Sequence, residues 1–184
     1  MRKDLGPKSF ISPMPVLIIA TYNEDGTANA MNAAWGGVSD TNEIMICLSK
    51  HKTTTNILRN KEFTVSFATK EHIAECDYVG LVSGNDVSNK LEKANLHTTK
   101  ASKVNAPIID ELPVAIECKL KSYDDSTGHL FASIENVSVD ETVMTNNKVD
   151  FNKFHPVIFE DLNHEYLEFG NKVGEAFQIG KTII

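Results

Sequence analysis

The sequence has little cysteine, and its cysteines form no recognisable motif. Cys47, Cys76 and Cys118 are far apart, and no Cys-x-x-Cys pair occurs. This spacing gives no support to a zinc-ribbon, iron–sulfur or thioredoxin-like site. The six histidines include no His-Glu-x-x-His motif, so we expect no metal centre. An odd number of cysteines is typical of a reducing compartment, and we therefore expect a cytoplasmic protein.

Long apolar runs and an excess of positive charge are also absent. No stretch approaches the length of a membrane span, and the start, MRKDLGPKSF, lacks the apolar core of an export signal. With 18 Lys and Arg against 25 Asp and Glu, the net charge is −7. A protein that binds a nucleic acid backbone needs a basic face. We expect no membrane and no nucleic acid partner, but one small anion site remains compatible with this charge.

The composition that is present belongs to an ordinary globular chain. Its 184 residues are 41% hydrophobic and 23% charged. A chain of this length buries roughly 70% of the surface that its unfolded form exposes. No internal repeat, low-complexity segment or evident linker divides the sequence. We expect a single domain over residues 1–184.

Short apolar runs separated by turn residues predict a mainly β fold, a β-barrel with helical insertions. Residues 14–22 read as a buried strand followed by a turn at Asp25-Gly26, with a partner strand at 29–35 that breaks at Gly36-Gly37. Further strands are predicted at 44–48, at 62–68 with one face buried, and at 114–121 with a hairpin partner at 130–139. Short helices are predicted within 49–60, 70–80 and 87–96, a connection at 107–113, and a less regular tail after residue 140.

Three segments could carry chemistry. Ser49, Lys50, His51, Lys52, Thr53 and Thr54 lie between a strand and a helix start, where free N–H groups and the helix dipole favour a phosphate. The alternative is a solvated loop in which Thr53 only caps the helix. Asn29, Ala30, Met31, Asn32, Ala33, Ala34 and Trp35 are small or polar, so that a flat ligand could approach the backbone, or they could simply be a sheet edge. Ser83 and Gly84, followed by Lys90, form either a further donor site or a plain turn.

In this order along the chain, the segments resemble the flavin reductase-like proteins with an FMN-binding split barrel, in particular the flavoredoxin type. The residues that carry the resemblance are PMPVLIIATYNEDGTANAMNAAW, SKHKTTTNILRNKEFTVSF, ECDYVGLVSGNDVSNK, the strand from Pro107 to Cys118, and the stretch from Tyr166 to Lys181. They cover nearly the whole chain. The sequence departs from many family members where His51 and Lys52 stand in place of an arginine, and lysine offers a point charge rather than a bidentate fork.

The resemblance implies FMN as the cofactor, bound with its ring along residues 29–35 and its phosphate at residues 49–54. It also implies a homodimer. We expect an oxidoreductase that passes electrons from NADH or NADPH through FMN to a second acceptor, and no catalytic side chain is assigned because the flavin carries the chemistry. His129 could be the histidine near which the nicotinamide approaches in some members. An electron carrier reduced by a partner protein is the alternative, and a barrel with a decayed site is the third.

Overall fold

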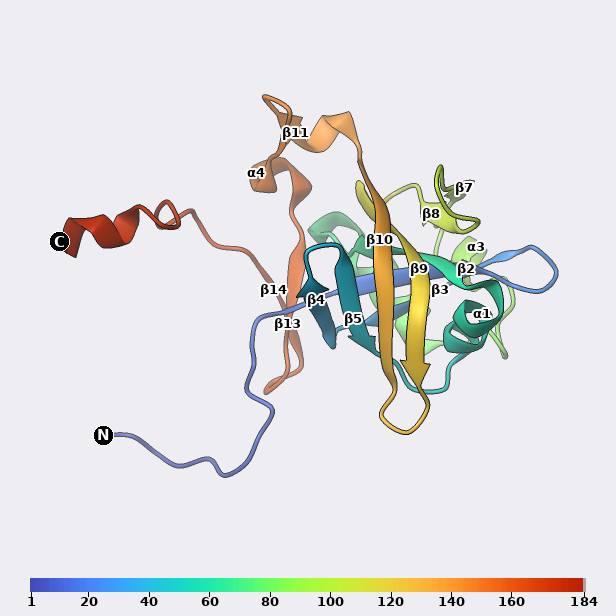
Figure 1. The fold of residues 1–184 in the computed structure, drawn as a ribbon, viewed down its shortest axis with the longest axis horizontal. Helices are drawn as coiled ribbons and strands as arrows, with labels where there is room; N and C mark the ends of the chain where they lie inside the picture. The colour runs from blue at the N-terminus through green and yellow to red at the C-terminus, as the bar shows by residue number, and fades with distance from the viewer. Residues whose placement is uncertain (184) are drawn as a thin grey trace.

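In the computed structural model, which describes residues 1–183, a curled seven-stranded antiparallel sheet forms the centre of the protein (Figure 1). Its strand order is β3-β2-β6-β9-β10-β5-β4. The outermost strands, β3 (Ala28–Ala33) and β4 (Gly36–Asp40), are separated along the chain by Ala34 and Trp35 alone. A sheet whose two edges are joined by two residues has to curve back on itself. The predicted barrel-like β fold is therefore confirmed.

The other strands of this sheet are β2 (Leu17–Tyr22), β5 (Glu43–Cys47), β6 (Glu62–Phe67), β9 (Val114–Asp124) and β10 (His129–Val139). The α-helices are α1 (Lys52–Asn60), α2 (Ile73–Leu81), α3 (Lys90–Lys93) and α4 (Phe151–Phe154), with 3-10 helices η1 (Lys70–His72), η2 (Glu141–Val143) and η3 (Ile179–Ile183). The remaining strands form three small sheets. The first contains β1 (Met14–Pro15), β13 (Val157–Glu160) and β14 (Glu165–Glu168). The second pairs β7 (Thr98–Lys100) with β8 (Pro107–Ile109), and the third pairs β11 (Met144–Thr145) with β12 (Lys148–Val149).

Two hydrophobic clusters lie on opposite faces of β2. Leu17 and Ile19 pack inside the barrel with Phe63 of β6, whereas Ile18 faces the cluster that includes Val79 of α2. This alternation follows from the two-residue period of a strand. Because both faces are covered, β6 is buried on both sides rather than on one. The prediction of a half-buried strand at 62–68 was wrong in that respect, because Thr64 and Ser66 are as buried as their apolar neighbours.

The predicted strand at 14–22 is in fact two strands in two sheets. Met14 and Pro15 pair with β13, while Leu17 to Tyr22 pair with β3 and the first four of these residues also pair with β6. Pro15 has no backbone N–H to donate to a ladder, and the chain passes from one sheet to the other at Val16. The tail after residue 140 is also more regular than predicted, because β13 and β14 form a hairpin in the same small sheet as β1.

The predicted break at Gly36-Gly37 was wrong, because β4 begins at Gly36. A Cβ at Gly36 would lie 3.0 Å from the carbonyl oxygen of Met45 and 3.1 Å from Leu17 Cδ1. This glycine therefore allows close packing inside a strand rather than a turn. The partner strand also ends at Ala33, two residues earlier than predicted.

The helix predicted at 87–96 spans only Lys90–Lys93. Before it, the N–H groups of Asp86 and Val87 bond the Ser83 carbonyl in a turn. After it, Asn95 adopts a φ of 53°, in the left-handed region that ends a helix. The proline-framed connection likewise contains a strand, since Pro107 opens β8. By contrast, the hairpin β9–β10 and the helices α1 and α2 are confirmed.

Both ends of the chain leave the barrel on the same side (Figure 1). Residues 1–13, the N-terminal arm, precede β1, and residues 170–183, the C-terminal arm, follow β14. Among the residues that the structure describes, no helix is long and apolar enough to cross a membrane.

Candidate functional site

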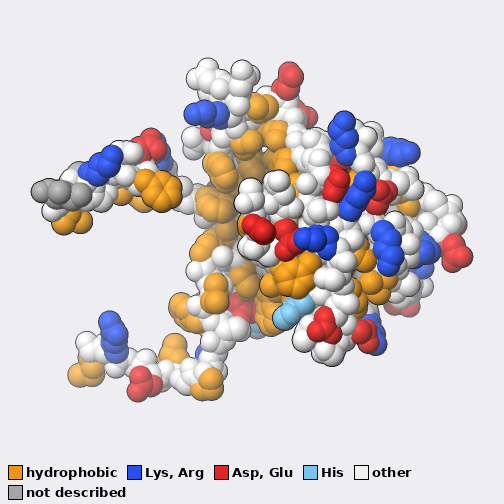
Figure 2. Space-filling view, in the orientation of Figure 1, with side chains coloured by type: hydrophobic (Ala, Val, Ile, Leu, Met, Phe, Trp, Pro, Cys, Tyr) orange, Lys and Arg blue, Asp and Glu red, His pale blue; other side chains and the backbone are white. Residues whose placement is uncertain are grey.

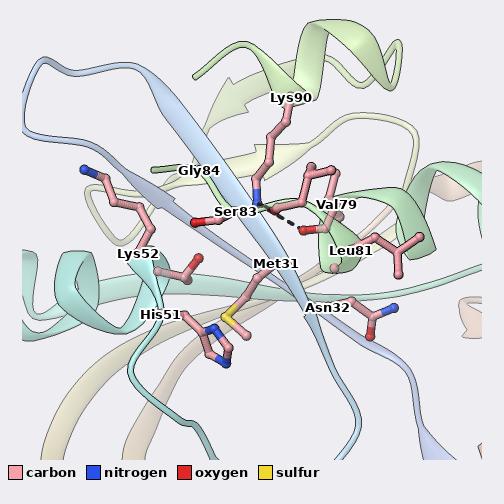
Figure 3. A pocket seen from close by; sticks show the side chains of 12 residues that line it. Met31, Asn32, His51, Lys52, Val79, Leu81, Ser83, Gly84 and Lys90 are labelled. Carbon is pink, nitrogen blue, oxygen red and sulfur yellow. Dashed lines mark hydrogen bonds between the residues drawn. The ribbon is translucent and has the colours of Figure 1, made fainter. Parts of the chain in front are cut away.

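A cavity of about 290 Å³ brings together residues from all three segments that the sequence singled out (Figure 3). We call it the site cavity. Its walls come from β3, from the start of α1, and from the end of α2 with the turn that follows. The lining residues are Met31, Asn32, His51, Lys52, Thr53, Val79, Gly80, Leu81, Val82, Ser83, Gly84 and Lys90.

The start of α1 supplies hydrogen-bond donors to the site cavity. His51 is the residue before the helix, with an extended backbone (φ −112°, ψ 168°). Thr53 therefore lies inside the first turn and is not the cap. The first N–H groups of a helix have no carbonyl partner within it, and the helix dipole is positive at this end. The N–H groups of Lys52 and Thr53 belong to this turn, so the cavity wall favours an anion.

A buried hydrogen bond links the two main predicted segments. Asn29 Nδ2 donates to Thr53 Oγ1 over 2.7 Å, and both side chains are at most 2% exposed. Because the Thr53 oxygen accepts here, its own proton is left for a second acceptor. This bond fixes β3 against the first turn of α1.

The rest of the predicted phosphate loop lies away from the site cavity. Thr54 is buried, and its hydroxyl donates to the Ser49 carbonyl over 2.7 Å. Ser49 and Lys50 line a separate hollow beside the β9–β10 turn, where Lys50 Nζ is 3.0 Å from Asp125. His129, at the start of β10, is exposed and is also outside the lining residues. Only His51, Lys52 and Thr53 of this loop face the cavity.

Only part of the segment from Asn29 to Trp35 reaches the site cavity. Ala30 is fully buried in the hydrophobic cluster beside α2, and Ala33 packs inside the barrel. Ala34 and Trp35 form the link to β4, where Trp35 is 53% exposed. Met31 and Asn32 alone contribute to the cavity lining.

Asn32 is held at the cavity wall by the neighbouring helix and by β14. Its Nδ2 donates to the Cys76 carbonyl over 3.2 Å and to Tyr166 Oη over 3.4 Å. Tyr166 in turn donates to Asp77 Oδ1 over 2.6 Å. Burial, together with the hydrogen bond to the Asp77 carboxylate, raises the pKa of Tyr166 to about 12. Since both amide protons have partners, the Asn32 oxygen is the group left for a ligand.

Two glycines let the α2 segment approach β3 closely. A Cβ at Gly80 would lie 2.8 Å from the Cβ of Asn32, and a Cβ at Gly84 would overlap the side-chain oxygen of Asn29. Ser83 meanwhile fixes the turn, because its Oγ accepts from the N–H of Asn85. Ser83 and Gly84 thus belong to a turn, as the plainer interpretation held, and this turn also forms a wall of the site cavity.

Lys90 is a lining residue that the sequence did not assign to the site. It is only 3% exposed. Its Nζ donates to the carbonyl of Val79 over 3.0 Å (Figure 3) and to that of Val82 over 3.1 Å. Burial lowers the pKa of this ammonium to about 8. A signal was available, because Lys90 precedes Leu91 and Ala94 on the buried face of a short helix.

The donors on these walls match a phosphorylated ligand. Lys52, Lys90, the Thr53 hydroxyl and the first turn of α1 all favour negative charge. An adjoining hollow of about 450 Å³ shares Lys52 and Gly84 with the site cavity but also contains Glu24 and Asp25. An anionic group therefore fits best on the α1 side. The two spaces together lie within the usual size range of small-molecule sites, roughly 300–1,000 Å³.

Comparison with known proteins identifies the family. The family model described as "flavin reductase like domain" matches residues 10–158. The structure resembles the flavoredoxin of Desulfovibrio vulgaris (Miyazaki F), with a TM-score of 0.92 and 32% identity over 98% of this chain and 100% of that one. The flavoredoxin of Methanosarcina acetivorans is 25% identical, with a TM-score of 0.88 and complete coverage of both chains.

An uncharacterised protein of Aquifex aeolicus is 27% identical to this chain and covers 80% of each sequence. The family match spans most of the chain, and the curled sheet agrees with the split-barrel structures of flavin reductase-like proteins. The protein belongs to the flavin reductase-like family.

Proposed function

We propose that this protein is a flavoprotein that binds FMN in the site cavity, with the phosphate at the start of α1. The observation that carries the proposal is the convergence of Lys52, Thr53 and Lys90 on one cavity whose other wall is β3. Thr53 has a proton to donate, and the two lysines supply positive charge without a broad basic face. The names of the similar proteins, two of them flavoredoxins, support the same cofactor.

The bound flavin supplies the hydride and electron chemistry, and the residues of this chain bind and orient it. Lys52, Thr53 and the first-turn N–H groups hold the phosphate. The Asn32 oxygen, fixed by Tyr166 and the Cys76 carbonyl, accepts a hydrogen bond from the ligand. Gly80 and Gly84 keep the wall opposite β3 free of side chains.

The phosphate assignment is tested by comparing FMN with riboflavin, which lacks the phosphate. Thr53→Ala combined with Lys52→Ala should weaken FMN binding at least about tenfold, because a charge-assisted hydrogen bond contributes about 1.5–3 kcal/mol. Riboflavin binding should hardly change. Thr55→Ala is the matched control, because Thr55 lies in the same turn but is exposed. Equal losses for both flavins would show that this end of α1 does not hold the phosphate.

We further propose an NAD(P)H-dependent oxidoreductase that passes electrons through FMN to a second acceptor. The alternative is an electron carrier reduced by a partner protein, and the 32% identity with a flavoredoxin is the observation that supports it. Anaerobic addition of NADH or NADPH to the FMN-loaded protein separates the two. Rapid bleaching of the flavin would rule out a protein that only carries electrons. An unchanged spectrum would rule out the NAD(P)H-dependent reductase.

A homodimer in the cytoplasm completes the proposal. The dimer is expected from the family resemblance, and the location from the odd number of cysteines. Sedimentation of the full chain tests the first, and fractionation of the cells that make the protein tests the second.

A further inference from the structure

The chain exposes more surface than a compact protein of its mass. Its accessible area is 11482 Å², whereas a folded monomer of 20.3 kDa exposes about 8,800 Å². The excess is about 2,700 Å² per chain on that scale. Interfaces of permanent homodimers bury about 2,000–5,000 Å² over both partners. Even half of the excess, taken from each of two copies, would make a stable interface.

Much of this exposed surface is apolar and lies in the two arms. In Figure 1 both arms extend away from the barrel. Exposed large hydrophobic residues of the arms include Phe10 (62%), Ile11 (85%), Val173 (93%) and Phe177 (96%). Leaving such side chains in water forgoes the free energy gained by burying them, which indicates that a second surface covers them.

An apolar hollow lies on the barrel at the base of the C-terminal arm. It has a volume of about 410 Å³, and its walls include Phe67, Val114, Phe151, Phe154, Val157 and Phe169. Phe151 is 57% and Phe169 is 52% exposed, and their rings meet edge to face with centroids 5.8 Å apart. Figure 2 shows hydrophobic side chains gathered on this side of the body, facing the space between the arms.

We propose that the C-terminal arm of one copy packs Val173 and Phe177 over the apolar hollow of a second copy, and that the second copy does the same in return. This rests on the proposed homodimer and adds the surfaces that form it. One chain carries both halves of the contact, the apolar arm and the apolar hollow. Two-fold symmetry then satisfies both halves at once, as isologous interfaces do. Phe169 joins the two surfaces, because it lines the hollow and directly precedes the arm.

The first test measures the oligomeric state of the full chain by sedimentation velocity over a range of concentrations. Phe177→Asp in the arm and Phe151→Asp at the hollow should each raise the dimer dissociation constant at least about a hundredfold. The reason is that an aromatic anchor is lost at two equivalent contacts. Asn171→Asp and Asn152→Asp are the matched controls, since both residues are exposed, Asn171 lies in the same arm as Phe177, and Asn152 follows Phe151 directly. A wild-type monomer, or dimers in both aromatic variants, would overturn the proposal.

The second test distinguishes exchange between copies from an arm folding back on its own chain. Phe177→Asp and Phe151→Lys, each monomeric alone, are mixed in equal amounts. In a mixed dimer one arm–hollow contact is native and the other pairs Asp with Lys, so dimers should return. A mixture that stays monomeric would contradict the exchange. FMN retention is measured on the same samples, because its loss from a wild-type dimer would count against the proposed cofactor and leave the arm exchange standing.

Discussion

Glu117 and Lys90 are both buried charged residues, but they differ in how completely the fold supplies their hydrogen-bond partners. Glu117 is fully buried in β9 and accepts four hydrogen bonds. The donors are Ser102 Oγ (3.0 Å), Asn136 Nδ2 (2.8 Å), and the N–H groups of Lys103 (2.6 Å) and Val104 (3.2 Å). Burial alone would raise the pKa of Glu117, but these donors outweigh it and the pKa is lowered.

Lys90 has only two carbonyl partners, although an ammonium has three protons to donate. Within residues 1–183 no ion pair is found for it. A buried cation without an anion is costly, and its free proton lies at the wall of the site cavity. Glu117 therefore has its partners within the fold, whereas Lys90 keeps a donor at the cavity wall, where we propose that the ligand binds.

The largest expected effect is on stability and concerns Glu117. Glu117→Gln puts an amide where the N–H groups of Lys103 and Val104 now donate to a carboxylate. Loss of these charge-assisted bonds should lower the free energy of unfolding by about 3 kcal/mol, measured by urea denaturation. Glu141→Gln, at an exposed carboxylate, is the control. Near-equal stability of the two variants would mean that the hydrogen bonds accepted by the Glu117 carboxylate do not stabilise the fold.

Lys90→Met should affect ligand binding rather than stability. It removes the ammonium and keeps an unbranched stem, so the free energy of unfolding should stay within about 1 kcal/mol of wild type. Affinity for FMN should fall about tenfold, because a charged donor is lost. Lys93→Met in the same helix is exposed and serves as control. Lost stability with unchanged FMN affinity would assign Lys90 to the fold instead.

A smaller effect should appear on raising the pH. The pKa of Lys90 is lowered to about 8, below its unfolded value of about 10.4. Deprotonation between these values therefore adds stability, while it removes the charge that attracts phosphate. The preference for FMN over riboflavin, measured by titration at pH 7 and pH 9, should shrink several-fold at the higher pH. In Lys90→Met this part of the pH dependence should vanish.

The smallest expected effect is at Tyr166. Tyr166→Phe removes the hydroxyl between Asn32 and Asp77, and should lower stability by only about 0.5 kcal/mol because the group is partly exposed. The Asn32 amide then loses one of its two fixed partners. Binding of FMN and riboflavin should weaken equally, in contrast to Lys90→Met, since Asn32 is expected to face the part that they share. A selective loss of FMN would contradict this.

The sequence predicted those strands and helices whose own residues show a regular pattern of apolar and polar side chains. The β9–β10 hairpin follows from alternating Val114, Ile116 and Cys118 and from a clear turn. The run at 14–22 gave no such guidance, because an apolar stretch does not reveal that its first residues join another sheet. In β14 all four residues are exposed, so it had no buried face to produce a pattern.

The candidate site was predictable in part, because two of its segments have recognisable local sequence patterns. The two segments joined by Asn29 and Thr53 were each visible in the sequence as a small polar run and a helix start. Their contact, and the burial of Ala30 away from the cavity, depend on how the sheet curls. Lys90 was named but not assigned, because a lysine on a helix is usually exposed. Its role depends on the carbonyls of Val79 and Val82, which only the folded chain brings near.

The link at Ala34 and Trp35 has a consequence for how this family can change. Outermost strands are ordinarily where extra strands add, during assembly or aggregation. Here two residues join the outermost strands, and Gly36 is packed against Leu17. An insertion at this link would displace both edge strands of the sheet together, whereas residues 125–127 of the β9–β10 turn are exposed. Variation in length among descendants of this chain should therefore spare residues 34 and 35.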